Sequence, residues 1–106
     1  IVAGDFFFAS GQIAIIPETG EIAEATIEAQ TEQVMKNIGN LLAAAGVDYS
    51  KVVKTSCFLA DMGDFGAFNE IYAKYFISKP ARSCVAVKTL PKNVLCEVEV
   101  IAYLGE

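Results

Sequence analysis

Arg82 is the only arginine of the chain, and it stands two residues before the apolar run of residues 84–87. A guanidinium group keeps its charge throughout the physiological pH range and is rarely buried without a partner. Its planar fork binds carboxylates through two parallel hydrogen bonds. Arg82 is therefore a candidate for binding a carboxylate, which could belong to this chain, to another subunit or to a small molecule.

Two glutamates lie in the last predicted strand, residues 94–104. Because side chains alternate along a strand, Glu97 and Glu99 share one face with Ile101 and Tyr103. The opposite face is apolar and comprises Cys96, Val98, Val100 and Ala102. The glutamates could simply face solvent, but their apolar neighbours indicate that their face is at least partly covered. A carboxylate in such a place could hold a water molecule and accept its proton.

The connection between the last two predicted strands is a short turn around residue 90. A short connection predicts that strand 83–87 and the last strand are antiparallel neighbours. Arg82 would then lie within a few residues of Glu97 and Glu99 across the ladder. Two interpretations stay open at this point. One is a cross-strand salt bridge, which contributes little at a surface. The other is a site in which Arg82 binds a substrate carboxylate and a glutamate holds a water.

Three further positions are candidates for a binding site. Ser10 and Gly11, followed by Gln12, interrupt the apolar strand predicted for residues 6–16. Such an interruption indicates a bulge, a close backbone approach or a ligand contact. Asn69 lies beside the apolar face of the second predicted helix, where an asparagine usually has no special function.

The residue types also exclude several chemistries. The chain has no histidine, which removes Ser-His and Cys-His catalysis. Its three cysteines, Cys57, Cys84 and Cys96, are odd in number and lack a CxxC spacing, so neither a disulfide framework nor a zinc site is expected. Buried thiols in a reducing compartment are the simplest interpretation, and they predict a cytoplasmic protein. No P-loop, GxGxxG or metal-ligand spacing occurs, so no cofactor and no metal are expected.

Composition indicates one small domain that associates with itself. The 106 residues fit a single domain over residues 1–106, yet 54% of them are hydrophobic, above the roughly 45–50% that is usual. The excess predicts an interface and hence a homo-oligomer. The net charge of −5, with eight scattered Lys and Arg residues, argues against a nucleic-acid partner. The longest uncharged run, residues 6–17, is too short to cross a membrane.

The periodicity predicts the order β-α-β-α-β-β, an α+β fold with a mixed or antiparallel sheet and two helices on one face. The first helix begins after Thr26 and stops at Gly46, and the second carries its aromatic residues on one side. Strands are expected at residues 6–16, 52–59, 83–87 and 94–104. A turn at residues 3–5 predicts an N-terminal hairpin whose first arm is incomplete in this chain. The second face of the sheet is expected to be covered by a partner subunit.

Several segments together resemble the RidA family, also called the YjgF or reactive-intermediate deaminase family. They are ASGQIAIIPETGEI, the segment from NIGNLLAAAGVDYSKV to FNEIYAKYF, and PARSCVAVKTLPKNVLCEVEVIAY. The similarity runs in order over nearly the whole chain, and PARSCV followed by LPK and EVEVIA is its most specific part. The resemblance implies a chorismate-mutase-like fold and a homotrimer with sites in clefts between subunits.

The resemblance also implies an activity, the hydrolysis of 2-imino acids and their enamine precursors to 2-keto acids and ammonia. Arg82 matches the arginine that binds the substrate carboxylate, and Glu97 matches the glutamate that orients the water. Cys84 matches a cysteine that lines the site. Ser10 and Gly11 match the family's SGQ motif and Asn69 its helix asparagine; the resemblance implies that they too contact the substrate.

This chain departs from the family pattern in two ways, and two other functions are considered. The chain begins after a Gly-Pro-Tyr motif whose tyrosine faces the ligand, and the loop before Pro80 is slightly shorter than in many relatives. A non-catalytic trimer that binds a small carboxylate and acts as a regulator is the alternative function. An endoribonuclease-type translation inhibitor, a label that some relatives carry, is disfavoured by the acidic charge and the lack of histidine.

Overall fold

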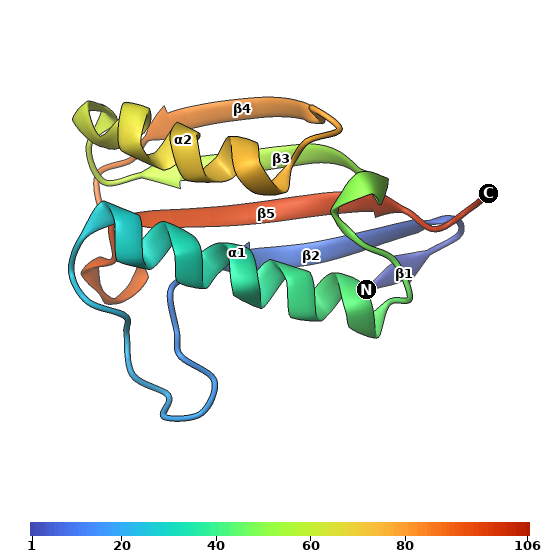
Figure 1. Ribbon diagram of the computed structural model, residues 1–106, viewed down its shortest axis with the longest axis horizontal. Coiled ribbons are helices and arrows are strands. Elements are labelled where there is room, and N and C mark those ends of the chain that lie inside the picture. Colours follow the sequence, from blue (N-terminus) through green and yellow to red (C-terminus); the bar gives the residue numbers. More distant parts are fainter.

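The computed structural model describes residues 1–106 as one β-sheet with both helices packed on the same face (Figure 1). The elements are β1 Val2–Ala3, β2 Phe6–Gln12, α1 Ile27–Ala44, β3 Val52–Leu59, α2 Phe65–Tyr75, β4 Ala81–Ala86 and β5 Cys96–Tyr103. Short 3-10 turns precede β3, α2 and β5: η1 Tyr49–Lys51, η2 Met62–Asp64 and η3 Pro91–Asn93. The predicted α+β class, the element order and the two-helix layer are confirmed.

The strands lie in the order β1-β2-β5-β3-β4. β3 and β4 are parallel, and all other neighbours are antiparallel. The prediction that β4 and β5 are adjacent is wrong, because β3 lies between them. The connection through α2 places β4 parallel to β3 at the edge of the sheet, as a crossover helix does. The turn η3 then carries the chain past β3, so that β5 occupies a central position where its apolar face is fully buried.

The first helix follows its sequence signals closely. The Thr26 side chain accepts a hydrogen bond of 3.1 Å from the backbone N–H of Ala29, as an N-cap does. Gly46 follows the helix with φ of +83°, a conformation that favours glycine at a helix end. One face of α1 is buried against the sheet and includes Ile27, Val34, Ile38 and Leu42.

The second helix supplies the aromatic part of the core. Asp61 caps the preceding turn η2 by accepting a hydrogen bond from the N–H of Gly63. Phe68, Tyr72 and Phe76 are buried, and the Tyr72 and Phe76 rings lie 4.6 Å apart. The aromatic side of α2 therefore faces the sheet, as its spacing predicts.

Strand boundaries differ from the predictions at several ends. β2 ends at Gln12 and not at residue 16, because a register shift between Ala9 and Gln12 ends the regular pairing with β5. β4 begins at Ala81, two residues earlier than predicted, and β5 begins at Cys96, two residues later. The N-terminal hairpin is confirmed, with β1 paired to β2 and Gly4 at φ of +60° in the turn.

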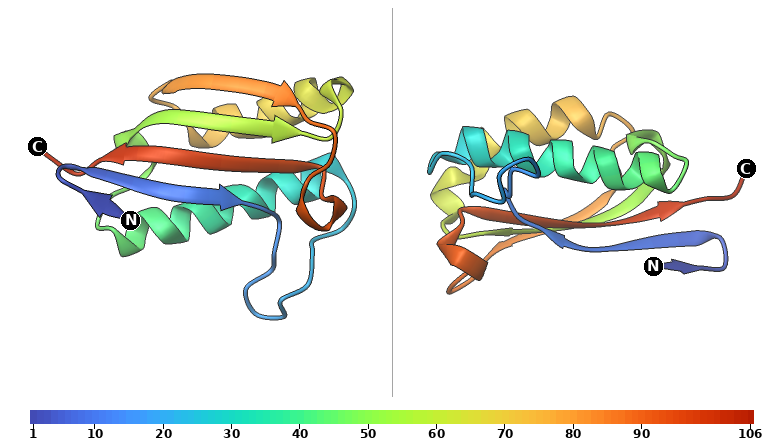
Figure 2. Two further views of the ribbon diagram at one scale, coloured as in Figure 1. Left: turned by 180° about the vertical axis from the view of Figure 1, so that it is seen from behind. Right: turned by 90° about the horizontal axis from the view of Figure 1, so that it is seen from below.

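No helix covers the second face of the sheet, which we call the open face (Figure 2). Phe6, Phe8 and Val85 project onto the open face, where their side chains are 39%, 40% and 50% exposed. No helix of this chain is both long enough and apolar enough to cross a membrane. Coverage of the open face by a partner subunit stays a prediction.

Candidate active site

Arg82 lies on the edge strand β4 and reaches toward α2. Its Nη1 donates a hydrogen bond of 2.6 Å to Oδ1 of Asn69. Its Cζ lies 4.6 Å from the centroid of the Tyr72 ring and 5.3 Å from that of the Phe65 ring. At these distances the face of an aromatic ring attracts a cation. Arg82 is therefore held by uncharged groups alone; we call these four residues the arginine cluster.

Sequence reasoning identified only part of the arginine cluster. Asn69 was expected near a ligand, whereas Phe65 and Tyr72 were expected only on the aromatic side of the helix. The signal was present in the spacing, since Phe65, Asn69 and Tyr72 follow one another at i, i+4 and i+7 and so share one helix face. The spacing alone does not predict that β4 lies next to this face of the helix.

A buried hydrogen bond fixes the Tyr72 ring. Its hydroxyl lies 2.7 Å from Oγ1 of Thr55, and Thr55 has no exposed surface. Thr55 is also the residue of β3 that pairs with Arg82 in register. Burial raises the pKa of Tyr72, so the phenol is neutral at physiological pH. The Tyr72 ring, which lies beside the guanidinium group of Arg82, is thus anchored in the core.

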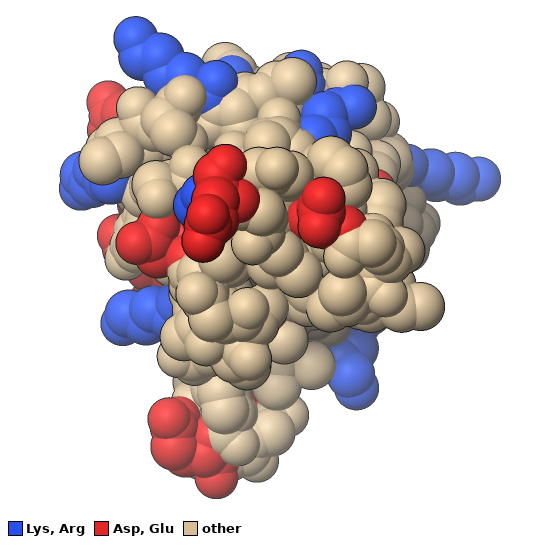
Figure 3. All heavy atoms as spheres, turned by 90° about the vertical axis from the view of Figure 1, so that its right-hand side faces the viewer, with Lys and Arg blue, Asp and Glu red and all other residues tan.

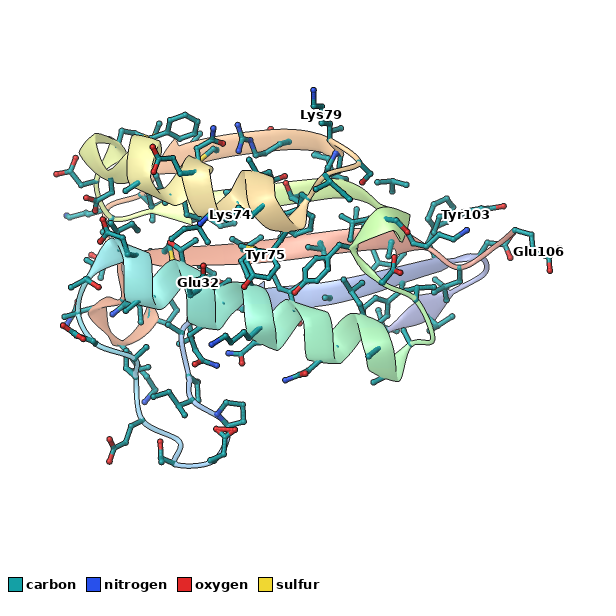
Figure 4. All side chains as sticks on the ribbon, in the orientation of Figure 1. Glu32, Lys74, Tyr75, Lys79, Tyr103 and Glu106 are labelled. Carbon is teal, nitrogen blue, oxygen red and sulfur yellow. The ribbon has the colours of Figure 1, made fainter.

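An open cavity of about 630 Å³ lies beside the arginine cluster. Its apolar lining consists of Tyr72, Ala73, Phe76, Ile77 and Pro80. Lys79 and Arg82 are its charged residues, and its lining contains neither Asp nor Glu. Lys79 itself points away from the sheet (Figure 4). The cavity has room for the body of a small ligand whose carboxylate meets Arg82.

Cys84 lies on the same face of β4 as Arg82 and is half-buried. It pairs in register with Cys57 of β3. Burial raises the pKa of the Cys84 thiol, and the nearby charge of Arg82 opposes this to a smaller extent. Burial also raises the pKa of Cys57 to about 12. Both thiols are neutral at physiological pH, which argues against Cys84 as a nucleophile, and Cys84 is not among the residues that line the cavity beside Arg82.

Glu97 lies on the open face of β5 and is half-buried. Its carboxylate rests against the backbone of β2, where a Cβ atom added to Gly11 would collide with Oε2 of Glu97. Gly11 stands at the register shift of β2, so the bulge expected at the Ser-Gly-Gln sequence is confirmed. Because Gly11 has no side chain, the Glu97 carboxylate can lie against the backbone of β2.

A smaller cavity of about 260 Å³ also lies on the open face. Its polar lining includes Ser10 and Glu99, together with Lys54 and Ser56 of β3. Sequence reasoning identified Ser10 and considered Glu99, but it missed the two residues of β3. No sequence signal pointed to them, because their position depends on β3 lying beside β5.

The predicted site residues fall into two groups on opposite faces of the sheet. Arg82 pairs with Thr55, and Thr55 pairs with Val100, which is buried beneath the helices. Glu97 and Glu99 alternate with Val100 and therefore face the other way. The prediction that Arg82 lies beside these glutamates within one chain is wrong. Asn69 and Cys84 lie on the side of Arg82, and Ser10 and Gly11 belong to the strand next to Glu97.

Comparison with known proteins assigns the family. The family model described as Endoribonuclease L-PSP matches residues 1–104. The structure superimposes on the crystal structure of the YjgF gene product from E. coli with a TM-score of 0.91 and 38% sequence identity, covering 97% of this chain and 84% of that chain. This chain belongs to the YjgF/RidA family. The resemblance found in the sequence is confirmed.

Two relatives of this YjgF/RidA chain carry names that describe an activity. The chain is 52% identical over 105 residues to the chloroplastic Reactive Intermediate Deaminase A of Arabidopsis thaliana, covering 98% of this chain and 56% of that protein. It is 43% identical over 99 residues to the 2-iminobutanoate/2-iminopropanoate deaminase of Mus musculus, covering 92% of this chain and 73% of that protein. These relatives support a deaminase function in general terms.

Proposed function

We propose that this YjgF/RidA protein hydrolyses 2-imino acids, such as 2-iminobutyrate or the imine of 2-aminoacrylate, to 2-keto acids and ammonia. The observation that carries the proposal is the arginine cluster, in which a cation lies beside a cavity lined by no acidic residue. Such a cation attracts a substrate carboxylate in place of an internal one. The deaminase names of the relatives point to the same chemistry.

The reaction needs few catalytic groups. Water adds to the carbon of the C=N bond while the imine nitrogen takes up a proton, which gives a carbinolamine. Collapse of the carbinolamine forms the C=O bond, breaks the C–N bond and releases ammonia. Arg82 anchors the carboxylate next to the electrophilic carbon, and Glu97 orients the water and accepts its proton. No cofactor is needed for this sequence of steps.

The remaining residues shape the site in this proposal. Asn69 holds Arg82, and the neutral thiol of Cys84 lies two residues further along the same face of β4. Gly11 leaves room for the carboxylate of Glu97, and Ser10 offers a hydroxyl on the same part of β2. A cytoplasmic location is part of the proposal, supported by three cysteines that are all free thiols.

We propose further that each site forms between two subunits of a homotrimer. Arg82 and Glu97 face opposite ways in one chain, so a site that uses both residues requires a second copy. The exposed apolar side chains of the open face support such an interface. A cyclic trimer brings the edge of one subunit to the open face of the next and repeats this contact three times.

The activity is tested by coupling the purified protein to a threonine dehydratase and following the release of 2-ketobutyrate. We expect the keto acid to appear faster than with dehydratase alone, and Arg82→Ala to remove the acceleration. Binding of 2-ketobutyrate without acceleration would instead support the regulatory, non-catalytic trimer. A properly folded oligomer that neither accelerates release nor binds the keto acid would disprove the proposed site.

The shared site is tested by mixing two inactive variants, Arg82→Ala and Glu97→Ala, under conditions that exchange subunits. Random mixing leaves both residues intact in about a quarter of the sites between subunits of a trimer. We expect about that fraction of the wild-type activity to return. No recovery after demonstrated exchange would mean that the two residues do not act at one shared site.

RNA cleavage is the function named in the description of the family model. A nucleic-acid site requires basic residues gathered on one surface. On the side of the molecule in Figure 3 the Lys and Arg side chains lie mostly around the rim of the view, and acidic side chains lie near its centre and at its lower end. Together with the net charge of −5 and the absence of histidine, this arrangement favours the imine reaction.

A further inference from the structure

The hydrogen bonding of Arg82 leaves one edge of its guanidinium group unused. Nη1 donates to Asn69, whereas Nε and Nη2, which lie together on the other side of the group, make no hydrogen bond within the chain. Cζ of Arg82 lies over the rings of Tyr72 and Phe65, and neither ring offers a hydrogen-bond acceptor that pairs with Nε or Nη2. A carboxylate can accept two parallel hydrogen bonds from an Nε–Nη2 edge.

We propose that Tyr72 and Phe65 are positioning residues that hold Arg82 so that its Nε–Nη2 edge receives the substrate carboxylate side-on. The proposal rests on the proposed function, because it concerns the same carboxylate site. It goes further in stating which nitrogen atoms bind the carboxylate and which residues orient them.

The ring of Tyr72 has the stronger role of the two. It lies closer to Cζ of Arg82 than the ring of Phe65 does, at 4.6 Å against 5.3 Å. It is 6% exposed and its hydroxyl is fixed by the buried Thr55, whereas Phe65 is only half-buried at the start of α2. A fixed ring restricts the orientation of the cation above it, so less freedom is lost when the carboxylate binds.

Asn69, which also orients Arg82, is uncharged, and this matters equally for carboxylate binding. Asn69 accepts a hydrogen bond from Nη1 without a charge of its own. A carboxylate in its place would satisfy Arg82 and compete with the substrate. The amide therefore orients the guanidinium group while its full positive charge stays available.

The unique arginine makes a direct test possible, since protein labelled with 15N-arginine gives signals from Arg82 alone. We expect the Nε–Hε signal of the folded wild-type protein to lie away from the position of free arginine, because two rings lie beside it. Tyr72→Leu should move the signal toward that position, and Tyr72→Phe, which keeps the ring, should move it much less. Phe65→Leu serves the same purpose should Tyr72→Leu fail to fold.

Tyr75→Phe is the matched control, because Tyr75 lies on the same helix but bonds to Glu32 of α1. Its Arg82 signal should equal that of the wild type. A wild-type signal at the position of free arginine would overturn the proposal. So would ring-removing variants of Tyr72 and Phe65 that fold and leave the signal unchanged.

Titration with 2-ketobutyrate tests the side-on geometry. We expect the Nε–Hε signal to shift as the keto acid binds, with Tyr72→Leu raising KM for the imine roughly 10-fold and changing kcat little. Turnover or binding with no shift of the Nε–Hε signal would overturn the inference and leave the proposed function intact. Absence of both turnover and binding would overturn both.

Discussion

The arginine cluster and the open face carry the two halves of the candidate site, and they are built in different ways. In the arginine cluster the functional group is held by three side chains of its own chain, one of which is anchored in the core. On the open face Glu97 rests against Gly11, and Val85, which is half exposed, lies in the same row across the sheet; Phe6 and Phe8 are partly exposed further along this face.

The difference indicates how the two halves depend on assembly. The arginine cluster is preorganised within one subunit, because all the groups that orient Arg82 belong to its own chain. The surroundings of Glu97 are unfinished, since a half-buried carboxylate beside exposed apolar groups changes its environment when that surface is covered. We therefore expect carboxylate binding to depend mainly on the arginine cluster and the water-activating step to depend on the subunit contact.

Arg82→Lys should have the largest effect. Lysine keeps the charge but loses the planar fork and the contact of the guanidinium group with two rings. We expect kcat/KM to fall about 100-fold while thermal stability changes little, since the side chain is exposed. Steady-state kinetics and a melting curve measure both. Activity near that of the wild type would show that a point charge is enough and that the preorganisation of this region has no functional value.

Gly11→Ala should damage the other half of the site. The added methyl group would occupy the position of the Glu97 carboxylate, which must then move. We expect kcat to fall about 10-fold or more with little change in KM, because the substrate carboxylate is bound elsewhere. Gly66→Ala is the control, since its Cβ would meet open space. A rise in KM with unchanged kcat would contradict the division of roles between the two regions.

Asn69→Asp changes the charge of the arginine cluster at nearly constant shape. The new carboxylate would pair with Arg82, so we expect KM to rise about 10-fold at pH 7. Asn40→Asp, on the exposed side of α1, controls for the change of net charge. Equal KM values for the two variants would mean that the charge of Arg82 is not what binds the substrate.

Much of the fold could be predicted from local patterns, whereas the site could be predicted only as a set of residues. The ends of α1 follow from Thr26 and Gly46, and the boundaries of β3 agree with the prediction at both ends. The sheet order could not be predicted, because the short connection before β5 is compatible with both a hairpin and a passage across the end of β3. The intervening strand β3 separates Arg82 from β5, and the alternation of side chains along β5 places Glu97 on the face opposite to Arg82.

Tyr75→Phe should have the smallest effect, and it tests whether the rigidity of the arginine cluster is local. The Tyr75 hydroxyl donates a hydrogen bond of 2.6 Å to Oε2 of Glu32, and the two side chains point toward one another from α2 and α1 (Figure 4). Loss of this bond should lower the free energy of unfolding by about 1 kcal/mol at pH 7. Kinetic constants should not change, since the contacts of Arg82 remain.

The same variant has an expected pH dependence. The hydrogen bond to Glu32 raises the pKa of Tyr75 to about 12 in the folded protein, above the value near 10 of an exposed tyrosine. A raised folded-state pKa gives stability that is present below about pH 10 and is lost as the pH rises through 12. Tyr75→Phe should therefore flatten the alkaline decline in stability, measured by denaturant unfolding between pH 9 and 12. Burial also raises the pKa of Tyr49 and Tyr72, so part of the decline should remain. If Tyr75→Phe instead raised KM, the orientation of Arg82 would depend on how α2 docks against α1, and the arginine cluster would be no more self-sufficient than the open face.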